Sequence, residues 1–249
     1  MDLNGKKILI TGGARGIGLE LLQTCVDAGA QVAICGRNEQ TIDKARVQLD
    51  RDILGITADI GDPGTPQFLY DRIQSEWNGL DILINNAAIQ QDLDFINNSS
   101  DQLLEKIADE FTIDLIAPVK ICAALMPLLK RSDDAMIVNI SSGLALAPKA
   151  AAPVYCAAKA GLSSFSRSLR YQAQKDAPHI KVADVILPIV ATDMTAGRGN
   201  NKMMASGAAQ SIVHGIRREK QTIHVGIAKL FAWIMRVVPS LGYRILRGT

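Results

Sequence analysis

Short apolar runs rich in β-branched residues alternate with longer amphipathic stretches along most of this chain. The apolar runs predict strands at residues 6–11, 31–35, 53–57, 80–85, 135–141 and 180–187, with a weaker seventh at 222–226. Helices are predicted between them at 17–29, 39–50, 64–77, 101–130 and 153–175. Continuous apolar runs are typical of strands buried on both faces, and strand–helix alternation specifies parallel strands joined by crossover helices. The sequence therefore predicts an α/β fold, a doubly wound parallel sheet with helices on both faces.

Composition limits the classes of protein that remain. Of the 249 residues, 48% are hydrophobic and 21% are charged, so the chain can bury a substantial core and is not disordered. It has no linker and no internal repeat, and we expect one domain over 1–249. Lys and Arg number 27 against 25 acids, a net charge of only +2, which disfavours a nucleic-acid partner. A small-molecule substrate is the expected partner.

Compartment and metal content follow from what the sequence lacks. The first apolar run is too short for a secretory signal, and we find no window of about 18 uncharged apolar residues that could span a membrane. The four cysteines are widely spaced and form no CxxC pair, which is typical of reduced core thiols. The three histidines have no ligand spacing, so no metal site is predicted. We expect a cytoplasmic protein.

The first predicted strand runs directly into TGGARGIG, which places glycines at 12, 16 and 18. Glycine permits positive φ and lets the backbone approach a ligand closely, while free N–H groups at a helix start attract phosphate. A glycine cluster alone could be an ordinary turn. Its position between a first strand and a helix favours a Rossmann-like, dinucleotide-binding fold.

The end of the second strand indicates which dinucleotide is bound. NAD-binding folds commonly carry an acid there for the ribose hydroxyls, but this chain has Cys35-Gly36-Arg37. A guanidinium pairs with a 2′-phosphate, and Arg15 in the glycine turn can approach the same group. These cations favour NADP(H) as the cofactor, although surface arginines would give the same pattern.

Three further residues could carry chemistry. Tyr155 and Lys159 are four residues apart, on one face of a predicted helix, and a nearby ammonium favours the phenolate form of a tyrosine. Ser142 lies at the end of the fifth predicted strand, where a hydroxyl could hold a carbonyl oxygen while Tyr155 donates a proton. A helix with a lysine extended along its surface is the alternative interpretation of the pair.

Together, TGGARGIG, Asp59, INNAA (84–88), Ser142 and YCAAK resemble the short-chain dehydrogenase/reductase family over residues 4–195. Within this family, the DltE-like oxidoreductases are the subgroup most similar to three longer segments, INNAAIQ, VNISSGLALAP and PVYCAAKAGLSSFSRSLRYQ. That name refers to a gene neighbourhood and supplies no substrate. The resemblance implies that Tyr155 is the general acid in reduction and the base in oxidation. It also implies that Lys159 lowers the pKa of Tyr155 and bonds the nicotinamide ribose, while Ser142 orients the carbonyl.

The resemblance also implies a set of cofactor contacts along the chain. The phosphates would be held by Gly12, Arg15, Gly16, Ile17, Gly18 and Arg37. The adenine would contact Asp59 and Ile60. The nicotinamide side would be lined by Asn86, Ala88, Tyr155, Lys159, Pro188, Val190 and Thr192.

Three positions depart from the family pattern. The asparagine that supports a proton relay to the lysine is Asp114 here, which we include among the catalytic candidates. The charge of an ionised Asp114 could pair with Lys159 or raise the pKa of that lysine. The last glycine of the NNAG signature is Ala88, and Leu187-Pro188 replaces Pro-Gly after the sixth strand.

Two segments outside these motifs carry predictions of their own. Residues 192–210 are glycine-rich and polar, which predicts a lid over the ligand edge of the sheet. Residues 225–247 mix large apolar side chains with cations, and we prefer a helix packed on the domain or in a subunit interface over one lying on an anionic membrane. In the family the long helices pair across a two-fold axis, which implies a homodimer or homotetramer.

The resulting prediction is an NADP-dependent oxidoreductase that interconverts a carbonyl and a secondary alcohol by hydride transfer. Two alternatives stay open: a dinucleotide-binding sensor or scaffold with little or no turnover, and a membrane-associated reductase of an acyl or lipid ketone.

Overall fold

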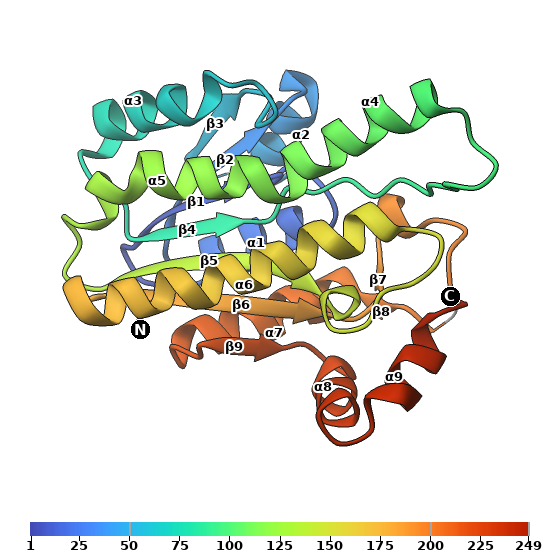
Figure 1. Ribbon diagram of the computed structural model, residues 1–249. Helices are drawn as coiled ribbons and strands as arrows, with labels where there is room; N and C mark the ends of the chain where they lie inside the picture. The colour runs from blue at the N-terminus through green and yellow to red at the C-terminus, as the bar shows by residue number, and fades with distance from the viewer. Residues whose placement is uncertain (50, 200, 249) are drawn as a thin grey trace.

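The computed structural model describes residues 1–49, 51–199 and 201–248, and its centre is a twisted parallel sheet with helices on both faces (Figure 1). Seven strands pair in the order β3-β2-β1-β4-β5-β6-β9, and every pairing is parallel. Their bounds are β1 Lys7–Thr11, β2 Gln31–Gly36, β3 Ile53–Thr57, β4 Ile82–Asn85, β5 Ala135–Ser142, β6 Ile180–Leu187 and β9 Thr222–His224. The predicted α/β fold and its seven strands are confirmed.

The chain reverses its direction of winding at β1. This strand lies between β2 and β4, so β2 and β3 extend the sheet one way and β4, β5, β6 and β9 extend it the other way. In open parallel sheets ligands bind outside the carboxyl ends of the strands at such a switch point. The predicted functional residues therefore belong at the carboxyl edge, beside β1 and β4.

Alternate strand residues supply two separate cores. In β1, Ile8 and Ile10 join one buried apolar cluster, whereas Leu9 joins the other. The first cluster is covered by α1 (Gly16–Asp27), α2 (Glu39–Leu49) and α7 (Ala205–Arg217). The second is covered by α3 (Thr65–Trp77), α5 (Ala117–Leu129) and α6 (Pro153–Asp176). Figure 1 shows α5 and α6 in front of the sheet and α1 behind it.

The helix predicted at 101–130 contains a π-helical turn. It runs as α4 (Ser100–Phe111), the π turn η1 (Thr112–Ile116) and α5, and the N–H of Ala117 bonds to the carbonyl of Thr112. Pro118 has no N–H to donate to the carbonyl of Asp114, four residues earlier, which removes one bond of a regular α-helix at this point. Such turns are frequent at functional sites, and this one contains Asp114.

The same helix corrects the expectation that no segment is apolar enough to span a membrane. Ser100–Leu129 includes an 18-residue window with a mean hydropathy of 1.7 and at most two charged residues. Length and composition alone give this result, and a core helix passes the same test. Here Ile121, Leu125 and Leu128 are fully buried against the sheet.

The predicted lid at 192–210 is shorter in the structure. Its last residues, from Ala205 onward, belong to α7, because Ala208, Ala209 and Ile212 are buried in the core. The earlier part includes a 3₁₀ turn, η3 (Asp193–Thr195), and a small parallel pair of β7 (Val190–Ala191) and β8 (Met203–Met204). Only the stretch between β7 and β8 remains a candidate lid.

The carboxyl-terminal segment forms two helices, α8 (Ala228–Val237) and α9 (Pro239–Leu246). They are separated at Val238, which precedes a proline and has an extended φ of −136°. In Figure 1 both helices lie beyond β9, the last strand of the sheet.

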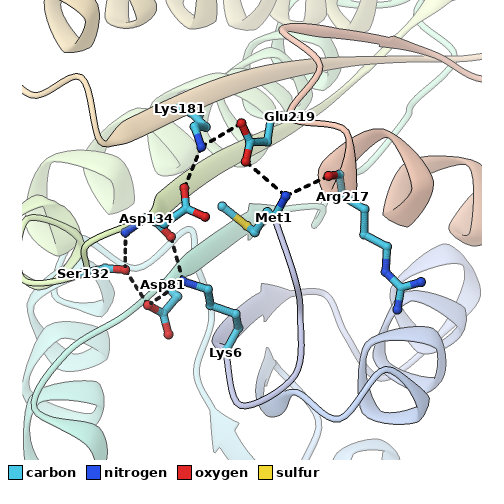
Figure 2. A network of polar contacts seen from close by, with 8 residues as sticks. All are labelled: Met1, Lys6, Asp81, Ser132, Asp134, Lys181, Arg217 and Glu219. Atoms are coloured by element: carbon cyan, nitrogen blue, oxygen red, sulfur yellow. Dashed lines mark hydrogen bonds and ion pairs between the residues drawn. The ribbon is translucent and has the colours of Figure 1, made fainter.

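A polar network joins segments at the amino edge of the sheet, opposite the predicted site (Figure 2). Asp81 accepts hydrogen bonds from the backbone N–H of Lys7 at 2.8 Å and from the hydroxyl of Ser132 at 2.5 Å. Lys181 bonds Asp134 at 2.6 Å and Glu219 at 2.8 Å, which connects β6 to the residues after α7. Chain segments far apart in sequence are thereby tied together at this edge.

All four cysteines are free and buried, as the sequence predicted. Burial raises the pKa of Cys25 in α1, Cys35 in β2 and Cys122 in α5 to about 12. Cys156 in α6 is also buried, and its sulfur accepts a hydrogen bond from the N–H of Lys149 at 3.4 Å.

Candidate active site

The glycine-rich turn leaves β1 and enters α1 at the carboxyl edge. Gly12 and Gly16 have φ values of +66° and +53°, a region that side chains other than glycine rarely adopt. Gly18 has ordinary φ, but a β-carbon there would overlap the carbonyl oxygen of Gly12. Arg15 is the residue that caps α1, and its side chain makes no capping hydrogen bond, so the first-turn N–H groups face the edge without a side-chain partner.

Hydrogen bonds connect this turn to the end of β4. The side-chain amide of Asn86 donates to the carbonyls of Thr11 at 3.0 Å and Gly12 at 3.2 Å. The backbone N–H groups of Asn86 and Ala87 both donate to the hydroxyl of Thr11. Asn86 therefore fixes the two sides of the crevice at the switch point relative to each other.

Arg37 lies at the end of β2 as predicted, but an acid is close to it in space. A guanidinium nitrogen of Arg37 is 3.8 Å from a carboxylate oxygen of Asp59, which follows β3. The two side chains are 60% and 46% exposed. An exposed pair at this distance contributes little free energy, so the guanidinium can exchange this partner for another anion.

Ser142, Tyr155 and Lys159 come together at the carboxyl end of β5. Ser142 is the last residue of β5, and its hydroxyl accepts a hydrogen bond from the N–H of Leu144. Tyr155 and Lys159 lie one turn apart in α6, with the Lys159 ammonium 5.6 Å from the centroid of the tyrosine ring. Both residues are buried, and Lys159 also donates to the carbonyl of Ile140 at 3.2 Å. The sequence-predicted trio is therefore one spatial group.

Burial dominates the acidity of the tyrosine. It raises the pKa of Tyr155 above its usual value, and the negative charge of Asp114 acts in the same direction. A hydrogen bond with Ser142 lowers the pKa. Because its pKa is raised, the buried Tyr155 is a protonated phenol at neutral pH.

Asp114 is fully buried beside the lysine. One carboxylate oxygen accepts the N–H of Ile89 at 3.0 Å and lies 3.8 Å from the Lys159 ammonium. The other has no hydrogen-bond partner among the described residues. Burial raises the pKa of Asp114 to about 6, while Lys159 and the Ile89 N–H act in the opposite direction. The sequence-based expectation that this acid could pair with Lys159 is confirmed.

A second buried acid, Glu110, was not singled out from the sequence. It lies four residues before Asp114 and accepts the N–H of Gln91 at 2.9 Å. Burial raises its pKa to about 7, and the charge of Asp114 contributes. The two carboxylates thus bind alternate N–H groups of the segment that follows β4. Their spacing of four residues on one helix was the available sequence signal.

The segment after β6 approaches the residues after β4. Thr192 caps the 3₁₀ turn η3, and Arg198 in the candidate lid forms an ion pair with Asp92 at 3.2 Å. Asp92 directly follows Gln91, whose N–H is bound by Glu110, so the ion pair joins the candidate lid to the segment after β4.

The predicted cofactor contacts all follow carboxyl ends of strands. They are Gly12, Arg15, Gly16, Ile17 and Gly18 after β1, Arg37 after β2, Asp59 and Ile60 after β3, Asn86 and Ala88 after β4, and Pro188, Val190 and Thr192 after β6. Within the described parts of the chain, no group of three or more His, Cys, Asp or Glu side chains could hold a metal ion.

A doubly wound parallel sheet with a glycine-rich first turn and a serine, a tyrosine and a lysine grouped at its carboxyl edge is typical of dinucleotide-dependent oxidoreductases. Comparison with known proteins agrees: residues 6–203 match the short chain dehydrogenase family. The chain belongs to this family of oxidoreductases.

Curated relatives span most of the chain. The chain is 34% identical to the uncharacterized oxidoreductase DltE of Bacillus subtilis, over 90% of this chain and 89% of that protein. It is 29% identical to the 3-oxoacyl-[acyl-carrier-protein] reductase FabG of Chlamydia pneumoniae, over 81% and 80%. The expected similarity to DltE-like oxidoreductases is confirmed.

Solved structures share the fold at low identity. A short chain dehydrogenase of Burkholderia cenocepacia in complex with NADP superposes with a TM-score of 0.86 at 20% identity, over 99% of both chains. A short chain dehydrogenase/reductase of Burkholderia phymatum in complex with NAD gives 0.86 at 16% identity, over 100% of this chain and 97% of that one.

Proposed function

We propose that the protein is an NADP(H)-dependent oxidoreductase that interconverts a carbonyl group and a secondary alcohol on a small molecule. The observation that carries this proposal is the grouping of the half-buried Ser142 with the buried Tyr155 and Lys159 at the carboxyl edge, next to the glycine-rich turn. The Lys159 ammonium, 5.6 Å from the Tyr155 ring, is the charge that a tyrosine acid–base catalyst needs nearby.

The residues at the switch point fit a dinucleotide. A β-carbon at Gly12 would lie 3.0 Å from the α-carbon of Ala87, so the absence of side chains keeps the crevice open. The N–H groups of the first turn of α1 have no side-chain cap and could hold the pyrophosphate. Asp59 and Ile60 would contact the adenine, and Thr192 the carboxamide. When bound, the cofactor supplies or accepts the hydride.

The preference for NADP(H) rests on Arg37 and Arg15. A 2′-phosphate presents more charge than the single carboxylate of Asp59 and can accept two parallel hydrogen bonds from one guanidinium. Arg37 can therefore exchange its exposed contact with Asp59, at 3.8 Å, for the phosphate. The structural relatives include both NAD and NADP complexes, so the preference depends on these side chains alone.

In reduction, the hydroxyl of Ser142 would donate a hydrogen bond to the substrate's carbonyl oxygen. Tyr155 would transfer its proton to that oxygen as the carbonyl carbon accepts a hydride, which leaves a phenolate beside the Lys159 ammonium. In oxidation the phenolate would take the proton back from the alcohol. Because burial raises the pKa of Tyr155, the lysine and the bound cofactor must together stabilise the phenolate.

Asp114 would act on this group through Lys159. Its carboxylate lies 3.8 Å from the ammonium, and its pKa of about 6 lets it hold or release a proton near neutral pH. Asp114 would thus take the place of the family's asparagine in returning a proton toward Tyr155.

Titration with NADPH and NADH, followed by absorbance of the nicotinamide during addition of ketones and acyl thioesters, tests this proposal. We expect tighter binding of NADPH, and an Arg37→Ala variant that loses about 10- to 100-fold in NADPH affinity with little change for NADH. Tyr155→Phe should bind NADPH normally and lose turnover.

The other outcomes are also informative. If neither nucleotide bound, the assignment of the glycine-rich turn would be wrong. The sensor hypothesis would be favoured by two results together. One is binding of NADPH without turnover of any carbonyl compound, and the other is a biological effect of Tyr155→Phe equal to that of wild type.

A further inference from the structure

The two carboxyl-terminal helices expose an unusually apolar surface. Within α8, Leu230, Trp233 and Val237 recur at spacings of three and four residues, which places them on one helix face. Trp233 is 61% exposed, and Ile227, just before the helix, is 72% exposed. The C-terminal apolar face, as we name it, comprises Ile227, Leu230, Trp233 and Val237, and Tyr243 and Ile245 of α9 are also exposed.

Little of this segment is used for packing. Among the residues of α8 and α9, only Ala228 and Gly242 are buried. Contiguous exposed apolar groups of this kind mark interaction sites. Phe231, Ile234 and Met235 are half-buried, so packing on the domain accounts for one face of α8 and leaves the other face open, and the predicted subunit interface stays a prediction.

The charge around this face has one sign. Glu219 is the last acid in the sequence, and the 30 residues after it carry five cations: Lys220, Lys229, Arg236, Arg244 and Arg247. Lys229 and Arg236 are seven residues apart and lie along one side of the apolar face of α8. Within the described chain, no carboxylate forms an ion pair with any of the five. The preferred partner is both apolar and anionic.

A second copy of the chain does not fit this description. In a two-fold contact the same patch meets itself, so unpaired cations would face cations without an acid between them. A nucleic acid would satisfy the arginines but leave the exposed tryptophan and aliphatic side chains without apolar partners. A bilayer with anionic headgroups satisfies both, because its interface takes apolar side chains and its surface potential attracts cations.

We propose that α8 and α9 form a surface that docks on anionic lipid bilayers, with the C-terminal apolar face inserted into the interface and the arginines on the headgroups.

The docked face would lie next to the substrate side of the active site. The ring of Phe231 in α8 approaches Gly143, directly after Ser142, and the carbonyl of Arg247 accepts the N–H of Ala150 at 3.2 Å. Both contacts are to the segment between β5 and α6 that follows the proposed catalytic serine. The docking proposal itself does not depend on the substrate or on turnover.

Co-sedimentation of the full chain with vesicles tests the surface. We expect binding to phosphatidylglycerol vesicles, little binding to phosphatidylcholine vesicles, and weaker binding at high ionic strength. Arg236→Glu/Arg244→Glu should reduce partition onto phosphatidylglycerol at least about tenfold. The control variant is Lys44→Glu/Lys130→Glu, which changes the net charge by the same amount at exposed sites outside α8 and α9. It should bind like wild type.

Fluorescence gives a second readout, since the chain has two tryptophans, Trp77 and Trp233. In a Trp77→Phe variant the emission reports Trp233 and should shift to the blue on addition of phosphatidylglycerol vesicles. Circular dichroism and NADPH binding identify variants that are misfolded.

Three results would overturn the proposal. One is absence of wild-type binding to phosphatidylglycerol at low salt. Another is equal loss of binding in both charge variants. The third is a combination of two observations: Trp233 emission that is already blue-shifted without vesicles, and an oligomer that dissociates in Arg236→Glu/Arg244→Glu. That combination would assign the face to a contact with a second copy of the chain.

Discussion

Asp114 replaces a neutral amide of the family pattern with a carboxyl group that titrates near neutral pH. Its charge raises the pKa of Tyr155, and it is itself about half ionised near pH 6. An Asp114→Asn variant should therefore lower the pKa of Tyr155. For alcohol oxidation, where Tyr155 acts as the base, we expect the kcat/KM profile to move to lower pH by about one unit.

This prediction is checked by rates between pH 5 and 10 for both proteins. The change should be smallest below pH 6, where Asp114 is largely protonated. Superimposable profiles would show that Asp114 does not influence the proton on Tyr155.

Glu110 makes stability depend on pH in a way that can be isolated. Its folded pKa of about 7 exceeds the ordinary glutamate pKa of 4.5, so the folded state binds the proton more tightly. The associated stabilisation is complete below pH 4.5 and is lost as the pH rises toward 7. Glu110→Gln lacks this titration, so its free energy of unfolding relative to wild type should rise by about 1–3 kcal/mol between pH 5 and 8.

Urea unfolding at several pH values measures this difference. Glu105, exposed on the same helix, supplies the control, and Glu105→Gln should follow wild type at every pH. Parallel stability curves for Glu110→Gln and wild type would contradict the burial of its charge.

Residue types and spacing were sufficient to predict Ser142, Tyr155 and Lys159, because one strand end and one helix turn bring them together. Glu110 could not be found in this way. It lies in an amphipathic helix with exposed acids nearby, and its burial depends on the segment after β4 bonding to it through Gln91, a long-range contact.

At the scale of elements, the glycine-rich turn depends on Gly18 for close packing. A β-carbon at this position would overlap the carbonyl oxygen of Gly12 and approach the side chain of Asn86. Gly18→Ala should therefore lower the free energy of unfolding by about 1–3 kcal/mol and weaken NADPH binding.

Urea unfolding and nucleotide titration check this prediction. Gly79→Ala is the control, because a β-carbon at Gly79 meets no atom within 4 Å. That variant should match wild type or be slightly more stable. Equal behaviour of the two variants would mean that the turn can relax around a side chain.

The strands were predictable because each is a continuous apolar run, but some helix details were not. The π turn combines a missing donor at Pro118 with long-range bonds to Asp114, and only the proline is visible in sequence. The helix α7 (Ala205–Arg217) was not predicted from the sequence. Its first residues, ASGAAQ, are small and typical of a loop, and they form a helix because Ala208 and Ala209 are buried in the core.

At the scale of the molecule, the amino-edge network stabilises the sheet at a distance from the active site. Asp81 satisfies the N–H of Lys7 and the hydroxyl of Ser132. Asp81→Ala leaves both without this acceptor and should cost about 1–3 kcal/mol in the free energy of unfolding. NADPH affinity should stay unchanged, because the network lies opposite the carboxyl edge.

Chemical unfolding and NADPH titration of the same preparation test this separation. Asp133→Ala removes an exposed acid next to Ser132, in the turn before β5, and should have a small effect. A large loss of NADPH affinity in Asp81→Ala would indicate that the two edges of the sheet are coupled.

The doubly wound parallel sheet was predictable from the alternation of strands and helices, whereas this network does not follow from the sequence. Its members lie in distant segments, from Met1 to Glu219, and nothing local indicates their pairing. The predicted dimer or tetramer likewise depends on surfaces between copies and stays a prediction.

The four buried cysteines give the protein a set of internal reporters of local opening. A thiol with a pKa of about 12 is thiolate in roughly one molecule in ten thousand at pH 8, so alkylation of the closed state is negligible. Labelling must then follow transient exposure, and its rate gives the opening free energy of the element concerned. Cys25, Cys35, Cys122 and Cys156 lie in α1, β2, α5 and α6, which makes mass spectrometry of alkylated peptides a map of opening across the sheet. Because Cys156 adjoins Tyr155, its protection on adding a nucleotide would report ordering of the active site without any turnover.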